Sequence, residues 1–411
     1  MPFRPRTAAD PLMPSIIFRK GLDLKEAVAG QLTAAYHSGL IEQMRADGFV
    51  RRGGRLTIHL AREFGFCYGV DRAVDYAYQT RKKFPDRRVF LTGEIIHNPH
   101  VNDQLRAQGI RILSDPGEDR GSLGPGDVVI LPAFGVSVGD LAWLDARGCT
   151  LVDTTCGSVL NVWKNVRRYA QEGFTSVIHG KVTHEETRAT ASQATQYPDA
   201  HFLIVRDEEE AGIACDFIRH GGDPAALLAR LGGGVSPGFD PARHLERIGC
   251  ANQTTMLMAE SLKIGEMFRQ AMVDRYGPDE AAGRFRAFDT ICSATQERQD
   301  AVIQLLDTDP LDLMVVIGGY NSSNTCNLAR ICAERVPTFH VADPDCLVSA
   351  DLIRHRPVGA PSTAAIAEME TAGWLADGAR RIGLTAGAST PNNIVGEVVE
   401  RLERFAGVNP G

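Results

Sequence analysis

Three cysteines share one sequence setting, between an apolar run that predicts a strand and an amphipathic stretch that predicts a helix. They are Cys67, Cys156 and Cys292, and each of the last two is the final residue of an Asp-Thr-x-Cys motif. A thiol at a helix N-terminus has a lowered pKa, because the helix dipole and the unpaired N–H groups favour the thiolate. Thiolates bind metal, and three of them from separate segments predict an iron–sulfur cluster. Electron-carrying 4Fe-4S clusters use four cysteines, so a three-cysteine site leaves one iron for a substrate oxygen and indicates catalysis.

The other six of the nine cysteines lack this setting. No Cys-x-x-Cys pair occurs, so cysteine spacing alone is a weak metal signal. Most of them are best explained as small buried hydrophobic side chains: Cys149, Cys215, Cys250, Cys332 and Cys346. Cys326 follows a Ser/Asn loop, and its role stays open. An odd number of cysteines in a long chain without a secretory apolar segment predicts reduced thiols in the cytoplasm.

A second group of candidate residues lies in polar loops that follow other apolar runs. They are His97, His184, Thr254, Ser322, Ser323, Asn324 and Ser389. Such neutral donors, together with helix N-termini, can bind a diphosphate. The chain has no Walker A sequence and no Gly-x-Gly-x-x-Gly motif before a plausible dinucleotide helix, which excludes a standard nucleotide cradle. Taken singly, each residue also fits a structural role, such as a turn histidine or a helix N-cap.

Glu186 is the candidate proton donor. It follows His184 by two residues, in a loop rich in Thr and Glu. A carboxyl group beside an imidazole can donate a proton at neutral pH if burial raises its pKa. The alternative is a solvated loop carboxylate, and the neighbouring Glu185 competes for the same role. Spacing does not choose between the two glutamates.

Apolar runs of four to seven residues alternate with amphipathic stretches of 12 to 18 residues, which predicts α/β units with parallel sheets. Each of the three cysteines follows a predicted strand, at 56–60, 150–152 and 285–288. Similar polar loops follow at similar distances after each cysteine. We therefore expect three similar α/β domains in a pseudo-threefold arrangement, with the site outside the carboxyl ends of the strands.

The repeat divides the chain into four segments. They are an N-terminal extension at 1–54, then domains at 55–152, 153–284 and 285–411. Within the extension, residues 24–47 are predicted to be helical, and 51–55 form a polar, glycine-containing break. A short organelle-targeting role for the first residues stays open, although the segment contains little serine.

Composition excludes several classes of protein. The chain has 411 residues, 44% of them hydrophobic, and a net charge of −7. No basic cluster with interleaved aromatic residues occurs, which argues against a nucleic-acid partner. The apolar run at 128–138 is broken by Pro132 and Gly135 and predicts a buried strand and turn. We therefore expect a globular chain with no membrane span.

Eight motifs resemble the LytB (IspH) family of 4-hydroxy-3-methylbut-2-enyl diphosphate reductases. They occur in the family's order between about residues 56 and 403. The motifs are Gly65-Phe66-Cys67-Tyr68-Gly69, Glu94-Ile95-Ile96-His97-Asn98, Asp153-Thr154-Thr155-Cys156, His184-Glu185-Glu186-Thr187, Gln253-Thr254-Thr255, Ile291-Cys292, Asn321-Ser322-Ser323-Asn324 and Thr385-Ala386-Gly387-Ala388-Ser389. The N-terminal segment and His179-Gly180-Lys181 are similar to the cyanobacterial and plant branch.

The resemblance implies three α/β domains around a 4Fe-4S cluster held by the three cysteines. It implies that the substrate diphosphate is bound by the residues matching His97, His184, Ser322, Asn324 and Ser389. Thr254 matches a residue near the substrate hydroxyl, and Glu186 matches the acid that delivers protons. The implied reaction removes the hydroxyl as water with two electrons and two protons. A ferredoxin or flavodoxin is the electron donor that the family suggests.

Two residues depart from the family pattern. Phe134 stands where many bacterial members have a histidine that binds diphosphate, and Gly157 stands where a proline is usual. Two other classes of function stay open from the residues alone. One is a hydrolase or transferase for a small phosphate ester, which would not need all three cysteines. The other is a binding protein that has kept the pocket without the reaction.

Overall fold

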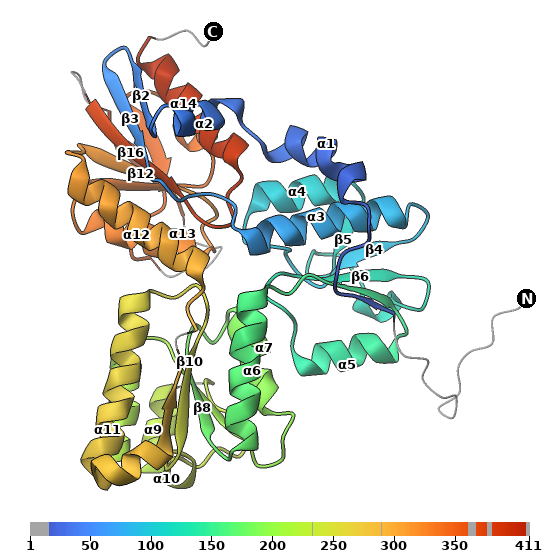
Figure 1. The fold of residues 1–411 in the computed structure, drawn as a ribbon, viewed down its shortest axis with the longest axis vertical. Coiled ribbons are helices and arrows are strands. Elements are labelled where there is room, and N and C mark those ends of the chain that lie inside the picture. Colours follow the sequence, from blue (N-terminus) through green and yellow to red (C-terminus); the bar gives the residue numbers. More distant parts are fainter. Residues whose placement is uncertain (1–15, 232, 289, 361–366, 376–379, 408–411) are drawn as a thin grey trace, which may run out of the picture.

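The computed structural model describes residues 16–231, 233–288, 290–360, 367–375 and 380–407. Three groups of strands and helices surround a common centre (Figure 1). Each group is built on an open sheet whose strands are largely buried on both faces, as in other parallel α/β sheets. The expected three α/β domains are therefore confirmed.

The three sheets have the same strand order. The first is β7 (Thr150–Asp153), β6 (Val128–Leu131), β4 (Val89–Leu91) and β5 (Ile110–Ile112). The second is β11 (Phe285–Ala287), β10 (Ile248–Asn252), β8 (Thr175–His179) and β9 (Phe202–Val205). The third is β3 (Leu56–Leu60), β16 (Arg380–Ala386), β12 (Leu313–Ile317) and β13 (Thr338–Val341). All neighbours within these sets are parallel.

Helices fill corresponding places in the three domains. The first set is α3 (Tyr68–Lys83), α6 (Gly157–Gln171) and α12 (Ser293–Thr308). The second is α4 (Pro99–Ala107), α7 (Glu185–Ala194) and α13 (Ser323–Ala333), and the third is α5 (Val138–Ala146), α11 (Met258–Arg284) and α14 (Asn392–Phe405). The other α-helices are α1 (Lys25–Tyr36), α2 (Gly39–Ala46), α8 (Glu208–His220), α9 (Pro224–Leu231) and α10 (Pro241–His244). Two further strands, β14 (Leu352–His355) and β15 (Met369–Ala372), form an antiparallel pair.

Each cysteine lies where the chain passes from one domain to the next. Cys67 follows β3 of the third sheet, yet it begins α3, whose Val70 and Val74 pack with the first sheet. Cys156 likewise follows β7 of the first sheet and begins α6, which packs on the second. Cys292 follows β11 of the second sheet and begins α12, which packs on the third. The three crossings bring the three cysteines to the centre.

The predicted segments differ from the sheets at two boundaries. The strands expected to open the first and third domains belong instead to the third and second sheets, as β3 and β11. The boundaries at 54/55 and 284/285 therefore fall one strand too early. Sheet membership depends on contacts distant in sequence, with β3 pairing β16 more than 300 residues away, so a repeat in the sequence cannot reveal it.

The N-terminal extension is part of two domains. β1 (Ile17–Phe18) extends the first sheet, and β2 (Val50–Gly53) pairs antiparallel with β3 in the third. The predicted polar break at 51–55 is wrong, because it is a hairpin. Its turn needs Gly54, which has a φ of +53° and whose added Cβ would lie 2.5 Å from the Ala406 carbonyl oxygen.

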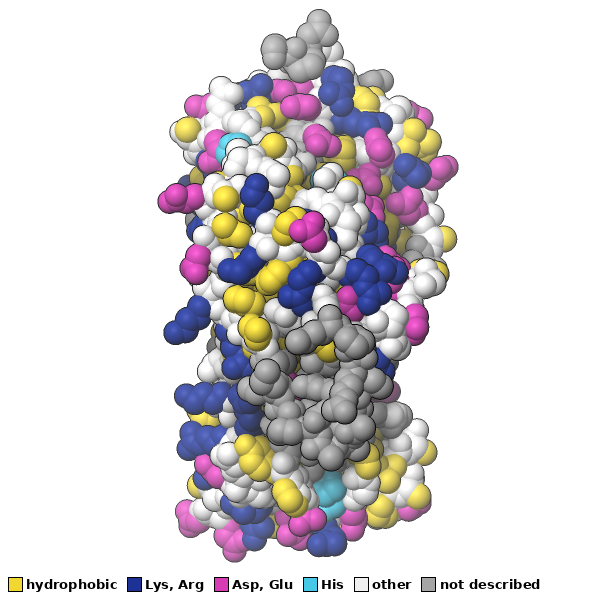
Figure 2. All heavy atoms as spheres, turned by 90° about the vertical axis from the view of Figure 1, so that its right-hand side faces the viewer, with side chains coloured by type: hydrophobic (Ala, Val, Ile, Leu, Met, Phe, Trp, Pro, Cys, Tyr) yellow, Lys and Arg dark blue, Asp and Glu magenta, His cyan; other side chains and the backbone are white. Residues whose placement is uncertain are grey.

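Basic and acidic side chains are interspersed over the face shown in Figure 2. In the part of the chain that the structure describes, no helix is both long and apolar enough to cross a membrane.

Candidate functional site

The predicted site residues meet in one small central cavity of about 80 Å³. It is lined by the three cysteines and by the polar loops of all three domains: Cys67, Cys156, Cys292, His97, His184, Glu186, Thr254, Ser322, Ser323, Asn324 and Ser389. Sequence reasoning missed Ser158 and Thr295, which also line it. Among the described lining residues there is no lysine and no arginine. The cavity is therefore built from thiols, one carboxyl group and neutral donors.

The three thiols each occupy a helix N-cap position. Gly69 makes their approach possible, because a Cβ there would lie 2.6 Å from Cys156 Sγ and 3.9 Å from Cys67 Sγ. Thr295 supports the third thiol, with its N–H 3.3 Å and its hydroxyl 2.9 Å from Cys292 Sγ. A larger residue at 69 would push the sulfurs apart or rotate them away from the cavity.

The expected direction of the thiol pKa is wrong for two of the cysteines. Burial raises the pKa of Cys67, and it raises the pKa of Cys292 to about 11. The N–H groups of Val70 and Thr295 act in the predicted direction, but the desolvation of the thiolate is larger. A bound cation would favour the thiolate form of these cysteines, as it does for metal ligands in general.

As they are placed in the structure, the three thiols are too far apart to bind one ion together. Among the described residues, only His97, His184 and Glu185 bring three potential ligand atoms within 4.8 Å of one another. A tetrahedral zinc ion with bonds of about 2.3 Å would hold three sulfurs closer than that. A cluster with one iron for each cysteine accommodates wider spacing, so the donor set fits an iron–sulfur cluster.

The two histidines contact each other at the wall of the cavity. Glu186 N–H donates to His184 Nδ1 at 3.2 Å, and burial holds the pKa of His184 well below its usual value. The neutral ring therefore carries its proton on Nε2, which lies 3.2 Å from His97 Nε2. This proton is directed at His97 Nε2, because the proton of His97 lies on Nδ1, toward Glu94. His97 is oriented by Glu94, whose carboxylate accepts from Nδ1 at 2.9 Å.

The N-terminus of α13 presents further donors to the cavity. Ser322 Oγ accepts from the N–H and the hydroxyl of Thr325, so its own proton is left to donate. Asn324 Oδ1 accepts from Ala388 N–H at 2.9 Å, while its Nδ2 is buried without a partner. An unpaired buried amide is costly, and an anion in the cavity would satisfy it. These groups give the cavity a polarity suited to phosphate oxygens.

The structure distinguishes the two glutamates that spacing leaves open. Glu186 is 1% exposed and lines the cavity, whereas the Glu185 side chain is 56% exposed and does not. Thr254 N–H donates to Glu186 Oε1 at 2.6 Å. Burial nevertheless raises the pKa of Glu186 to about 7. Near neutral pH, Glu186 can therefore hold and release a proton inside the cavity.

Phe134 lies against both histidines. Its ring stacks on His97, with centroids 4.3 Å apart, and meets His184 edge-on at 5.6 Å. The side chain fixes the two imidazoles but offers no hydrogen-bond donor. The missing donor expected from the sequence is therefore not replaced at this position.

The chain matches the family model described as LytB protein over residues 58–403. A Gloeobacter violaceus protein named 4-hydroxy-3-methylbut-2-enyl diphosphate reductase is 49% identical over 398 residues, covering 95% of this chain and 93% of that protein. A Thermosynechococcus vestitus protein of the same name is 49% identical over 387 residues, 93% of each. These similarities agree with the cyanobacterial branch expected from the sequence.

Two solved structures are similar. One, of (E)-4-hydroxy-3-methyl-but-2-enyl diphosphate reductase, has a TM-score of 0.50 and 25% identity, covering 84% of this chain and 99% of that one. The other is the E-1-hydroxy-2-methyl-but-2-enyl-4-diphosphate reductase from Plasmodium falciparum. It has a TM-score of 0.60 and 20% identity, covering 87% of this chain and 91% of that one. The second likeness concerns the fold alone.

Proposed function

The chain belongs to the LytB family, and on that premise we propose that it reduces 4-hydroxy-3-methylbut-2-enyl diphosphate. The products are isopentenyl and dimethylallyl diphosphate, and the reaction is the last step of the non-mevalonate isoprenoid pathway. One observation carries this proposal: three helix-capping thiols, one buried carboxyl group and a set of anion donors line the same cavity. A phosphate-ester hydrolase would not need the thiols, and a binding protein would not need the carboxyl group.

Cys67, Cys156 and Cys292 would hold a 4Fe-4S cluster, with Gly69 leaving room beside two of the sulfurs. When bound, the cluster supplies electrons and a Lewis-acidic iron with an open position. The remaining steps belong to the chain's own side chains. This assignment gives a reason for the two hydrogen bonds between Cys292, the third-domain thiol, and Thr295.

His97, His184, Ser322, Asn324 and Ser389 bind the diphosphate. Their side chains come from loops of all three domains, so a bound diphosphate would hold the domains together around the substrate. Ser323 lines the same part of the cavity. Fixing the diphosphate also orients the hydroxyl end of the substrate toward the thiols and Glu186.

Glu186 delivers the protons. The net reaction breaks one C–O bond, takes up two electrons and two protons, and releases water. One proton joins the departing hydroxyl oxygen, and the other is added to the allylic carbon skeleton. Thr254, whose N–H and hydroxyl bind the Glu186 carboxyl group, positions this acid near the substrate hydroxyl. His184 contributes by orientation, since its Nδ1 accepts from Glu186 N–H.

The electrons come from outside the chain, from a ferredoxin or a flavodoxin in the cytoplasm. Turnover of the substrate by anaerobically reconstituted protein, with a reduced one-electron dye as donor, tests the proposed reaction. We expect both isomeric products together with two equivalents of oxidised dye for each substrate. Release of inorganic phosphate or diphosphate without oxidation of the dye would instead establish a hydrolase.

A further inference from the structure

The proposed substrate is a polyanion, yet the described lining of the cavity contains no lysine and no arginine. Phe134 adds no donor. Helix N-termini contribute only partial charges, and their effect fades within the first turn. One cationic side chain nevertheless contacts a residue of the cavity wall. Lys181, in the loop between β8 and α7, is half-buried, and its Nζ donates to Ser323 Oγ at 3.0 Å. Burial lowers the pKa of Lys181 from its usual value.

The hydrogen bonds around Ser323 determine where its hydroxyl proton points. Gln253 Oε1 accepts from the N–H of Lys181 and from the hydroxyl of Thr187, which identifies the oxygen side of this amide. Gln253 Nε2 therefore faces the other way, and it donates to Ser323 Oγ at 3.3 Å. Both lone pairs of the Ser323 oxygen are then occupied by donors. Its proton has to point elsewhere, and Ser323 lines the cavity.

We propose that Lys181 is a positioning residue that supplies the cationic charge for the substrate diphosphate, acting through the hydroxyl of Ser323. The ammonium group polarises this hydroxyl and makes it a strong donor to a phosphate oxygen. The same charge compensates for the donor that Phe134 does not provide. This inference rests on the proposed function, since it concerns the diphosphate of that substrate.

Lys181 lies between the central cavity and a second group of charged side chains. Behind it lies a second pocket of about 480 Å³, which includes the basic Arg206, Arg330 and Arg356 and the acidic Asp207 and Glu260. Arg206 pairs with Asp207 at 2.8 Å, and Arg330 lies 3.9 Å from Glu260. Lys181 connects this charged group to the cavity, through its hydrogen bond to Ser323.

Affinity for inorganic diphosphate, measured by titration calorimetry on the reconstituted protein, tests the role of Lys181 without requiring turnover. We expect Lys181→Met to weaken diphosphate binding about 10- to 100-fold, the usual worth of a hydrogen bond to a charged group. Lys181→Arg should recover most of the affinity. Lys164→Met, an exposed change on α6, is the matched control and should bind as the parent does. Parental affinity in Lys181→Met would overturn the proposal.

A double-mutant cycle separates positioning from a merely structural role. In a Ser323→Ala background, Lys181→Met should cost much less than it does alone, because the relay is already broken. Fully additive losses, or losses that track lowered iron content, would show that Lys181 only supports the fold. Phe134→His should restore part of the affinity lost in Lys181→Met.

The steady-state parameters distinguish failure of this inference from failure of the proposed function. Lys181→Met should raise KM for the substrate much more than it lowers kcat. If the parent protein binds diphosphate through Lys181 but never reduces the substrate, the proposed reaction is wrong and the inference stands. If the parent reduces the substrate while Lys181→Met keeps its KM, the inference is wrong and the reaction stands.

Discussion

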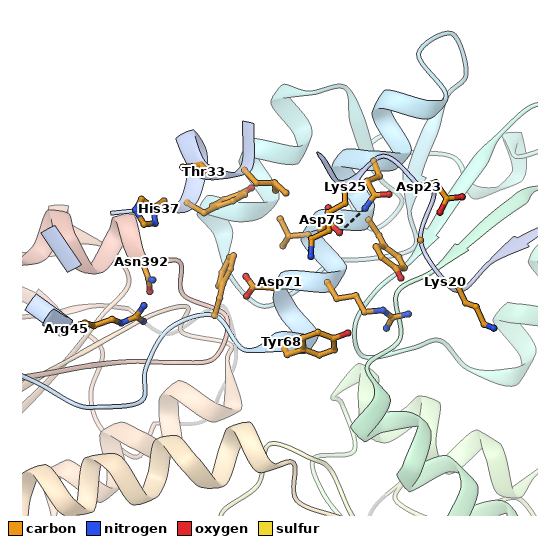
Figure 3. Close-up of a pocket in the computed structure, with 18 residues that line it drawn as sticks. Lys20, Asp23, Lys25, Thr33, His37, Arg45, Tyr68, Asp71, Asp75 and Asn392 are labelled. Atoms are coloured by element: carbon orange, nitrogen blue, oxygen red, sulfur yellow. Dashed lines mark hydrogen bonds between the residues drawn. The ribbon is translucent and has the colours of Figure 1, made fainter. Parts of the chain in front are cut away.

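The central cavity and the pocket in Figure 3 differ in almost every respect. The outer pocket, of about 710 Å³, lies between the N-terminal segment, α1 and α3, whereas the central cavity measures about 80 Å³. Lysines and arginines line the outer pocket beside aspartates, among them Lys20, Lys25, Asp71 and Asp75. The central cavity has thiols, one carboxyl group and neutral donors.

The difference shows that burial and donor direction, rather than size, indicate chemistry here. In the outer pocket Lys25 and Asp71 are exposed, so water screens their charges. In the central cavity Glu186 is almost fully buried, and its proton affinity changes as a result. Asn324 Nδ2 is buried there without a hydrogen-bond partner in the protein. Substitutions in the two regions should therefore have very different effects.

The largest effect is expected at the thiols. Cys156→Ser should lose most of the iron and all measurable turnover, because one iron loses its protein ligand. Cys250→Ser is the matched control, since Cys250 is buried in the core of the second domain away from the cavity. Iron and acid-labile sulfide analysis measures both. Loss of the cluster in Cys250→Ser as well would contradict the assignment of three ligands.

The next largest effect is expected at the buried carboxyl group. Glu186→Gln should retain the cluster and diphosphate binding but lower kcat about 10²- to 10⁴-fold, the usual contribution of a positioned acid. Glu185→Gln, a change at an exposed side chain, should lower kcat far less. Equal losses in the two variants, measured with the reduced dye, would show that burial does not select the acid.

The pH dependence sharpens the same contrast. The pKa of Glu186 is raised to about 7, so its carboxyl group is protonated below that pH and ionised above it. Because the protonated form donates, kcat should fall as the pH rises through about 7. The residual kcat of Glu186→Gln should not show this fall with rising pH. A pH profile of the same shape in both proteins would assign the proton to another group.

A smaller effect is expected at the diphosphate donors. Asn324→Asp keeps the oxygen that accepts from Ala388 N–H but replaces the unpaired amide with a carboxylate facing the anion. KM should rise about 10- to 100-fold, with kcat changing much less. Asn161→Asp, exposed on α6, is the control. An unchanged KM in Asn324→Asp would remove this residue from the site.

The smallest effects are expected where no ligand group is needed. Phe134→His alone should change KM by less than about threefold, or ~0.6 kcal/mol, if Lys181 already compensates. Lys25→Met in the outer pocket should leave turnover unaltered, because Lys25 is exposed there. A large gain in substrate affinity in Phe134→His would show that the parent protein lacks a diphosphate donor. A loss of turnover in Lys25→Met would show that the outer pocket contributes to the reaction.

The sequence alone predicts which residues meet in the central cavity, because these residues lie at strand–helix junctions. Cys67, Cys156 and Cys292 each begin a helix as expected, and the predicted polar loops do lie at the ends of strands. These features depend on neighbours along the chain. Their convergence on one cavity follows from the repetition of the same unit three times.

Features set by long-range packing could not be predicted. The sheet to which β3 belongs depends on β16, and the thiol pKa depends on burial that no local pattern reveals. Glu185 and Glu186 are adjacent in sequence, but they point in different directions from the first turn of α7. In the sequence, Lys181 is only part of a stretch that is similar to the cyanobacterial and plant branch. Its role could not be predicted, because its contact with Ser323 spans 142 residues.

The central claim is that three thiols at three domain crossings hold one cluster. Iron and acid-labile sulfide content, with a visible absorption spectrum, tests it most directly on protein purified and reconstituted without oxygen. The account predicts about four irons and four sulfides per chain, with a broad absorption that dithionite bleaches. Colourless protein without iron after anaerobic reconstitution would contradict it, and would make the three cysteines structural.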